Sequence, residues 1–145
     1  MKIVSMVFII FSIITFRMCS VDETHGDVEL TLSPSYTSGT LYLTPVITYT
    51  GDDPITFQYD NSIAWIDEVT FDGVSMYEKD NDEPLTMKHQ STLNKNEKRN
   101  GPTIEIKAEP GQYKVELTSL FYIDSSEGER QRFVHSIVQT IEATR

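Results

Sequence analysis

The sequence has little cysteine, and this scarcity limits the chemistry open to it. Cys19 is the single cysteine among 145 residues, so no disulfide can form within the chain. Small secreted domains of animals commonly depend on disulfides. The sequence also lacks an Asn-x-Ser/Thr glycosylation acceptor, because Asn61-Ser62-Ile63 has its hydroxyl one position early. Both absences favour an exported protein of bacterial origin.

Positive charge is scarce as well. The chain has 12 Lys and Arg against 22 Asp and Glu, which gives a formal net charge of −10. Such a surface repels the phosphates of nucleic acids and anionic lipid headgroups. We therefore expect no nucleic-acid partner, and we take solubility as the simplest role of the acidic surface.

The motifs of common catalytic and metal sites are missing. His25, His89 and His135 show none of the His-x-x-x-His or Glu-x-x-His spacings that bring metal ligands together. No Gly-x-Ser-x-Gly turn supports a nucleophilic serine, and no glycine-rich loop could hold a phosphate. We predict that the protein is not an enzyme and has neither a cofactor nor a metal site. A hydrolase that uses His89 or His135 is the least favoured alternative.

The longest apolar run lies at the N-terminus. Lys2 precedes Ile3–Phe16, a run of 14 uncharged residues, and small or polar residues then lead to Val21-Asp22-Glu23. This order is typical of a secretory signal peptide. As a helix, the run would span about 21 Å, less than the roughly 30 Å hydrocarbon core of a bilayer. We predict a cleaved signal peptide over residues 1–20, with no stable membrane span after cleavage. The protein would then be secreted, periplasmic or part of the cell envelope.

Other fates of this segment stay open. It could remain as an uncleaved anchor or pack as a core helix. A lipoprotein would be acylated at Cys19, but Arg17 and Met18 stand where such motifs have a small residue. Residues 21–26 are predicted to be a polar leader, and residues 27–145 a single domain. A domain of this size buries roughly two-thirds of its unfolded surface, so it needs no disulfide.

Beyond the leader, apolar and polar residues alternate. In Gly39–Tyr59, apolar side chains of one parity flank the turn residues Gly51–Pro54. Side chains on a strand alternate between its faces, so each such set builds one apolar face. We predict a β-hairpin here. Pro45 predicts a bulge or an edge position, because proline has no amide hydrogen to donate.

Further strands are predicted on both sides of this hairpin. Val28 opens a first strand that Pro34 is expected to stop. Asp72-Gly73 separates two β-rich runs and predicts a second hairpin. Tyr113–Ile123 is the longest alternating segment, and the Val, Ile and Thr content of Arg132–Ala143 favours a closing strand over a helix.

Together these elements predict an all-β fold. Seven to nine short strands with regular turn signals are typical of an antiparallel β-sandwich of immunoglobulin-like type. The cysteine–tryptophan–cysteine core of antibody domains is missing.

A series of turn and core motifs runs through roughly Leu41–Ile123. It consists of Thr48–Tyr59 (TYTGDDPITFQY), Val69–Tyr77 (VTFDGVSMY), Thr92–Glu97 (TLNKNE) and Pro110–Val115 (PGQYKV). This series resembles the BsuPI family, immunoglobulin-like domains named after an intracellular proteinase inhibitor of bacilli. The resemblance implies a sandwich fold and an inhibitor-like role. The chain differs from the family in its export segment and at Asp60–Trp65 (DNSIAW), which replaces a glutamine-containing segment.

Loops carry recognition on a rigid sandwich, so two loops are the candidate binding site. The residues are Asp60, Asn61, Ser62 and Ile63 in the first loop, and Asp80, Asn81, Asp82 and Glu83 in the second. The second loop, with Asp52 and Asp53, could also form a weak calcium site. It lacks the glycine and final glutamate of an EF-hand, so a solvated acidic loop is the simpler interpretation.

The sequence thus predicts an exported, non-enzymatic module that binds a protein partner of unknown identity. A proteinase-inhibitor-like protein is one form of this hypothesis. The alternative is a structural or assembly protein of the cell envelope, whose sandwich edge recruits a strand from another chain.

Overall fold

The computed structural model describes residues 23–80 and 88–144. The predicted signal peptide and the loop residues Asn81, Asp82 and Glu83 lie outside the described residues. The described part of the chain holds no helix that could cross a membrane. It forms the strands β1 (Val28–Thr37), β2 (Thr40–Tyr49), β3 (Ile55–Tyr59), β4 (Ala64–Phe71), β5 (Val74–Glu78), β6 (His89–Leu93), β7 (Lys98–Asn100), β8 (Ile104–Lys107), β9 (Gly111–Asp124) and β10 (Arg130–Ala143).

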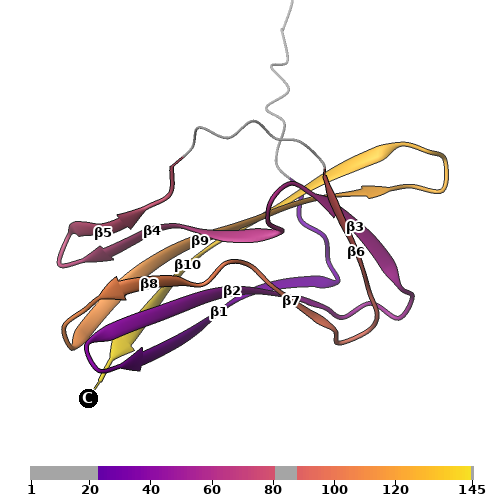
Figure 1. Ribbon diagram of the computed structural model, residues 1–145. Helices are drawn as coiled ribbons and strands as arrows, with labels where there is room; N and C mark the ends of the chain where they lie inside the picture. The colour runs from indigo at the N-terminus through magenta and orange to yellow at the C-terminus, as the bar shows by residue number, and fades with distance from the viewer. Residues whose placement is uncertain (1–22, 81–87, 145) are drawn as a thin grey trace, which may run out of the picture.

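Two antiparallel sheets pack face to face, which confirms the predicted all-β sandwich (Figure 1). In the smaller sheet, β2 lies between β1 on one side and both β7 and β8 on the other. In the larger sheet, β9 lies between β10 on one side and both β4 and β3 on the other, with β5 beside β4 and β6 beside β3. The long β9–β10 hairpin runs the length of the molecule (Figure 1).

The core forms where the inner faces of the two sheets meet. Alternate side chains of β9 are fully buried, as the predicted alternation requires: Tyr113, Val115, Leu117, Ser119 and Phe121 are each 0 % exposed. From β3, Phe57 meets Phe121 edge to face, with 4.9 Å between ring centroids. Such a geometry is favourable for aromatic pairs beyond the area that they bury.

The predicted hairpin over Gly39–Tyr59 is wrong in its pairing. β2 and β3 lie in different sheets, so Gly51–Pro54 carries the chain across the sandwich. The Tyr49 hydroxyl donates to the Asp53 carbonyl oxygen (2.6 Å) and closes this connection. Gly51 is needed because a Cβ there would lie 2.2 Å from the same hydroxyl oxygen. Both strands bury the parity set that the sequence indicates, but burial parity does not identify the neighbouring strand.

Both strand prolines behave differently from the prediction. β1 continues through Pro34 to Thr37, and the chain turns at Ser38 and Gly39, which have φ values of 51° and 75°. Within residues 23–80 and 88–144, β1 pairs only with β2, so a missing amide hydrogen on its outer side costs no ladder bond. Pro45 lies inside the central strand β2, between the part that pairs with β8 and the part that pairs with β7. The proline therefore sits where β2 changes partner, rather than at an edge or a bulge.

The second predicted hairpin is confirmed. Asp72 and Gly73 connect β4 to β5 with φ values of 48° and 76°. In β4 the buried residues are Ala64, Ile66 and then Val69, because the register with β9 shifts between Ile66 and Glu68. This bulge explains why the apolar residues of the segment change parity in the sequence.

Candidate functional site

The first predicted binding loop, residues 60–63, connects β3 to β4. Asp60 and Ser62 are partly exposed and Asn61 is exposed, as a recognition loop requires. Ile63 is 1 % exposed and belongs to the core cluster, and it also lines the base of the hollow beside the loop, so its part in binding stays a prediction. Its carbonyl oxygen accepts the Leu120 amide hydrogen (3.2 Å), which fixes the end of the loop on β9. An apolar residue at the end of a polar loop is more simply explained as a core residue.

Asn61 and Ser62 line a surface hollow of about 470 Å³ together with Tyr59 and residues 99–102. In this hollow, Arg99 Nη2 donates to Ser91 Oγ (2.6 Å). The same Ser91 hydroxyl pairs with the Tyr59 hydroxyl (2.8 Å). The hollow therefore presents a guanidinium that donates to the Ser91 hydroxyl, and that hydroxyl is in turn paired with the Tyr59 hydroxyl.

The second predicted loop is only partly described. Asp80 is exposed and follows β5, whereas Asn81, Asp82 and Glu83 lie outside the described residues. Asp52, invoked for calcium, pairs with Lys95 (Oδ1 to Nζ, 2.6 Å). Across residues 23–80 and 88–144, no group of three or more His, Cys, Asp or Glu side chains could hold a metal ion.

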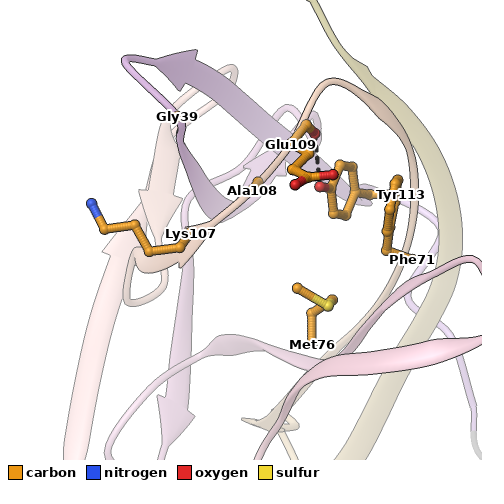
Figure 2. A pocket seen from close by; sticks show the side chains of 7 residues that line it. All are labelled: Gly39, Phe71, Met76, Lys107, Ala108, Glu109 and Tyr113. Atoms are coloured by element: carbon orange, nitrogen blue, oxygen red, sulfur yellow. Dashed lines mark hydrogen bonds between the residues drawn. The ribbon is translucent and has the colours of Figure 1, made fainter.

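An apolar pocket of about 440 Å³, which was not predicted, lies between the β4–β5 hairpin and the end of β8 in the opposite sheet. Figure 2 shows the Met76 side chain pointing into this space, with Phe71 and Tyr113 on one side. The two rings stack with 4.6 Å between centroids. The Tyr113 hydroxyl donates to the Glu109 carbonyl oxygen (2.8 Å), and burial raises the pKa of this tyrosine.

The opposite wall of the pocket carries two charged residues, Lys107 and Glu109. The Lys107 ammonium points away from the other labelled side chains (Figure 2) and donates to Thr40 Oγ1 (3.1 Å). Val74, 61 % exposed, and Met76, 40 % exposed, extend the apolar surface along β5. The pocket could accept an apolar side chain. A sequence signal existed in Val74 and Met76, two large apolar residues in one short strand.

The outer edge of β10 is the third feature. β10 pairs with β9 without interruption over all 14 of its residues. On its other side, the Val134 amide donates to the Glu23 carbonyl oxygen (2.9 Å). In an antiparallel ladder, alternate residues direct both backbone groups to the same side. Ser136, Val138, Thr140 and Glu142 therefore direct their N–H and C=O groups outward. Among residues 23–80 and 88–144, no strand pairs with this part of the edge.

The composition of this edge is unusual. From Phe133 to Ile141 it contains no Asp, Glu, Lys, Arg, Pro or Gly. Val138 is 61 % exposed at its centre. Edge strands are normally protected from further pairing by charges, prolines, bulges or short length. The sequence analysis predicted this strand, and as a separate hypothesis it predicted that a sandwich edge recruits a strand from another chain. Periodicity alone could not show which strand lies at the edge of a sheet.

Comparison with known proteins identifies no family. The chain matches no protein-family model, and no curated protein matches it. The BsuPI resemblance therefore stays a prediction that rests on the motifs described above.

Proposed function

We propose that this protein is a non-enzymatic binding module that takes an extended segment of another protein onto the outer edge of β10. The observation that carries the proposal is the unprotected edge from Ser136 to Glu142. Every second residue of this edge offers an outward N–H and C=O. A strand added there would gain main-chain hydrogen bonds, which supply affinity in recognition by strand addition.

The side chains around this edge specify the kind of partner. Val138 and Thr140 lie on the solvent face, and both are β-branched, so they favour β-branched or aromatic neighbours on an added strand. Ile137 is partly buried against the core and would give the added strand an apolar contact on the other face. A formal net charge of −10 disfavours a second copy of this chain. The partner is therefore an uncharged or basic segment of a different protein.

Export is a second part of the proposal. It is supported by the charge on Lys2 and the apolar run Ile3–Phe16, followed by small and acidic residues. Edge recognition would then take place outside the cytoplasm, in the envelope or beyond it. Sequencing the N-terminus of the protein recovered from producing cells tests this part. A start near Val21 is expected, and an intact Met1 would contradict it.

A proteinase-inhibitor-like role remains the second candidate. The observation that favours it is the hollow beside Asn61 and Ser62, where Arg99 is held by Ser91. A target loop could enter this hollow. Inhibition assays against representative serine, cysteine and metalloproteinases at micromolar protein concentration test this role. If the role is correct, the protein inhibits one of these proteinases and the Arg99→Ala protein inhibits it less.

The edge proposal is tested by substitutions at Val138. Val138→Pro removes an amide hydrogen that points away from β9, so the sandwich should still fold. Val138→Thr keeps that hydrogen and the β-branched shape, and it is the matched control. A photo-crosslinking residue at Thr140 would capture the partner in producing cells.

The expected result is one crosslinked partner that the Val138→Thr protein retains and the Val138→Pro protein loses by about tenfold or more. Equal capture by the Val138→Pro protein would overturn the proposal, as would the absence of any crosslink. Crosslinking to a second copy would assign the edge to self-association instead. Circular dichroism of each variant verifies that the fold is intact.

A further inference from the structure

Part of the β10 edge is already occupied by the chain itself. Glu23 forms a parallel bridge with Phe133, and its carbonyl oxygen accepts the Val134 amide hydrogen (2.9 Å). The next contact of this segment is made by His25, whose backbone amide donates to His135 Nε2 (3.1 Å). The His25 ring meets the Phe133 ring edge to face at 5.1 Å. We call residues 23–27 the edge segment. This segment covers the beginning of the β10 edge, and the uncovered part of the edge starts at Ser136.

The contact with His135 requires a neutral imidazole. A backbone amide can only donate, so Nε2 must carry its lone pair and the single ring proton must be on Nδ1. His135 is 9 % exposed and stacks on the Phe121 ring at 5.8 Å. Burial lowers the pKa of His135, and the electrostatic influence of the neighbouring His25 lowers it further.

The charged groups near this contact come mainly from the edge segment. They are the carboxylates of Glu23 and Asp27, and beside them lies the titratable His25, whose Nδ1 accepts the Asp27 amide hydrogen (3.2 Å). Directly opposite His135, β9 presents Ser119, which carries no charge. On β10 itself the nearest charged residue is Arg132, and β1 begins with the buried Val28 before Glu29. The influence of charge on His135 is dominated by His25.

We propose that the edge segment is a pH-sensitive cover: protonation of His135 at Nε2 removes its acceptor, residues 23–27 leave β10, and the Val134 backbone joins the open edge. Protonation places a positive N–H against the His25 amide, which also donates, so two donors then face each other. The open edge then begins at Val134 instead of Ser136, because the outward N–H and C=O groups of Val134 become available. The use of this longer edge by a partner rests on the proposed function, whereas the release of the segment does not.

Hydrogen exchange measured by NMR on the purified protein without any partner tests the release. The Val134 amide should be protected at about pH 7.5 and should lose about tenfold or more of its protection factor by about pH 5. The Ile137 amide, which points to β9, should keep its protection and serves as the internal control. In a His135→Gln protein, which keeps an acceptor but cannot take a charge, Val134 should stay protected at both pH values.

A second measurement keeps the inference testable if His135→Gln does not fold. The imidazole resonances of His135 report its protonation directly, and their midpoint should coincide with the loss of Val134 protection. Titration of the imidazole without a change at Val134 would overturn the inference, as would equal loss in the His135→Gln protein. Because no partner is present, the result is independent of the crosslinking from Thr140 and of the substitutions at Val138.

Discussion

At the scale of single residues, two buried serines have opposite surroundings. Ser119 is 0 % exposed, and within the described residues its hydroxyl has no hydrogen-bond partner. Ser91 is 7 % exposed, and its hydroxyl meets both the Tyr59 hydroxyl and Arg99 Nη2. Because an unpaired buried polar group costs about 1–3 kcal/mol, the two hydroxyls should affect stability in opposite directions.

We therefore predict that Ser119→Ala leaves the free energy of unfolding unchanged or raises it by about 1 kcal/mol. Ser91→Ala should lower it by about 1–3 kcal/mol, since the buried Tyr59 hydroxyl loses its partner. Urea denaturation of both proteins checks this. A clear loss of stability in the Ser119→Ala protein would show that the hydroxyl is hydrogen-bonded in solution.

His135 makes stability depend on pH in a definite direction. Its pKa in the folded protein is lowered by burial and by His25, whereas the unfolded chain has an ordinary histidine pKa near 6.5. The unfolded state thus binds the proton more readily than the folded state. The contribution of neutral His135 to the free energy of unfolding is therefore complete above about pH 6.5, and it is lost as the pH falls toward the lower pKa that His135 has in the folded protein.

Urea midpoints measured from about pH 8 to pH 5 should show this decline, and the His135→Gln protein should show a flatter profile. Asp124 does not interfere, because the hydrogen bond from Arg130 lowers the pKa of that carboxyl and moves its effect to a more acidic range. Equal slopes for the two proteins would contradict the assignment to His135.

At the scale of elements, the β4–β5 hairpin depends on its turn. Gly73 has a φ of 76°, and a Cβ there would meet no atom within 4 Å. The cost of Gly73→Ala is therefore conformational and should lower the free energy of unfolding by about 1 kcal/mol. Gly26→Ala is the matched control, since its Cβ also meets nothing and its backbone needs no positive φ. Thermal melts of both proteins measure the difference, and equal melting temperatures would contradict it.

The element scale also shows how much could be predicted from the sequence. The alternation of apolar and polar residues predicted the buried side chains of β9, and Asp72-Gly73 predicted the β4–β5 hairpin, because both signals are local. The error in pairing β2 with β3 could not be avoided from the sequence, because strands of both sheets bury the same kind of apolar face against one core. Arg99 meets Ser91 because β6 and β7 enter different sheets, and Met76 and Tyr113 line one pocket through the packing of strands that are far apart in the sequence. The hollow and the open edge therefore had no local signal, and the pocket had one only in the two large apolar residues of β5, Val74 and Met76.

At the scale of the whole molecule, most strand pairs join segments that are far apart in sequence. β3 pairs with β6 and with β9, and β2 pairs with β7 and β8, so the sheets cannot form from local hairpins alone. Loop-closure entropy must be overcome before such pairs contribute stability, and this slows folding of all-β sandwiches to milliseconds or seconds. The absence of any cysteine after Cys19 means that no disulfide in the folded domain can shorten these loops.

We predict that refolding from urea, followed by the fluorescence of the single tryptophan, Trp65, takes milliseconds to seconds. Trp65 lies on β4, where its indole N–H donates to Asp67 Oδ1 (2.7 Å) beside Lys79. Its emission therefore reports when β4 joins β9 and the bulge at Asp67 forms. Gly73→Ala should slow this phase if the β4–β5 hairpin forms early, and should speed unfolding if it forms late. Complete refolding within microseconds would contradict a fold whose sheets depend on pairing between distant segments.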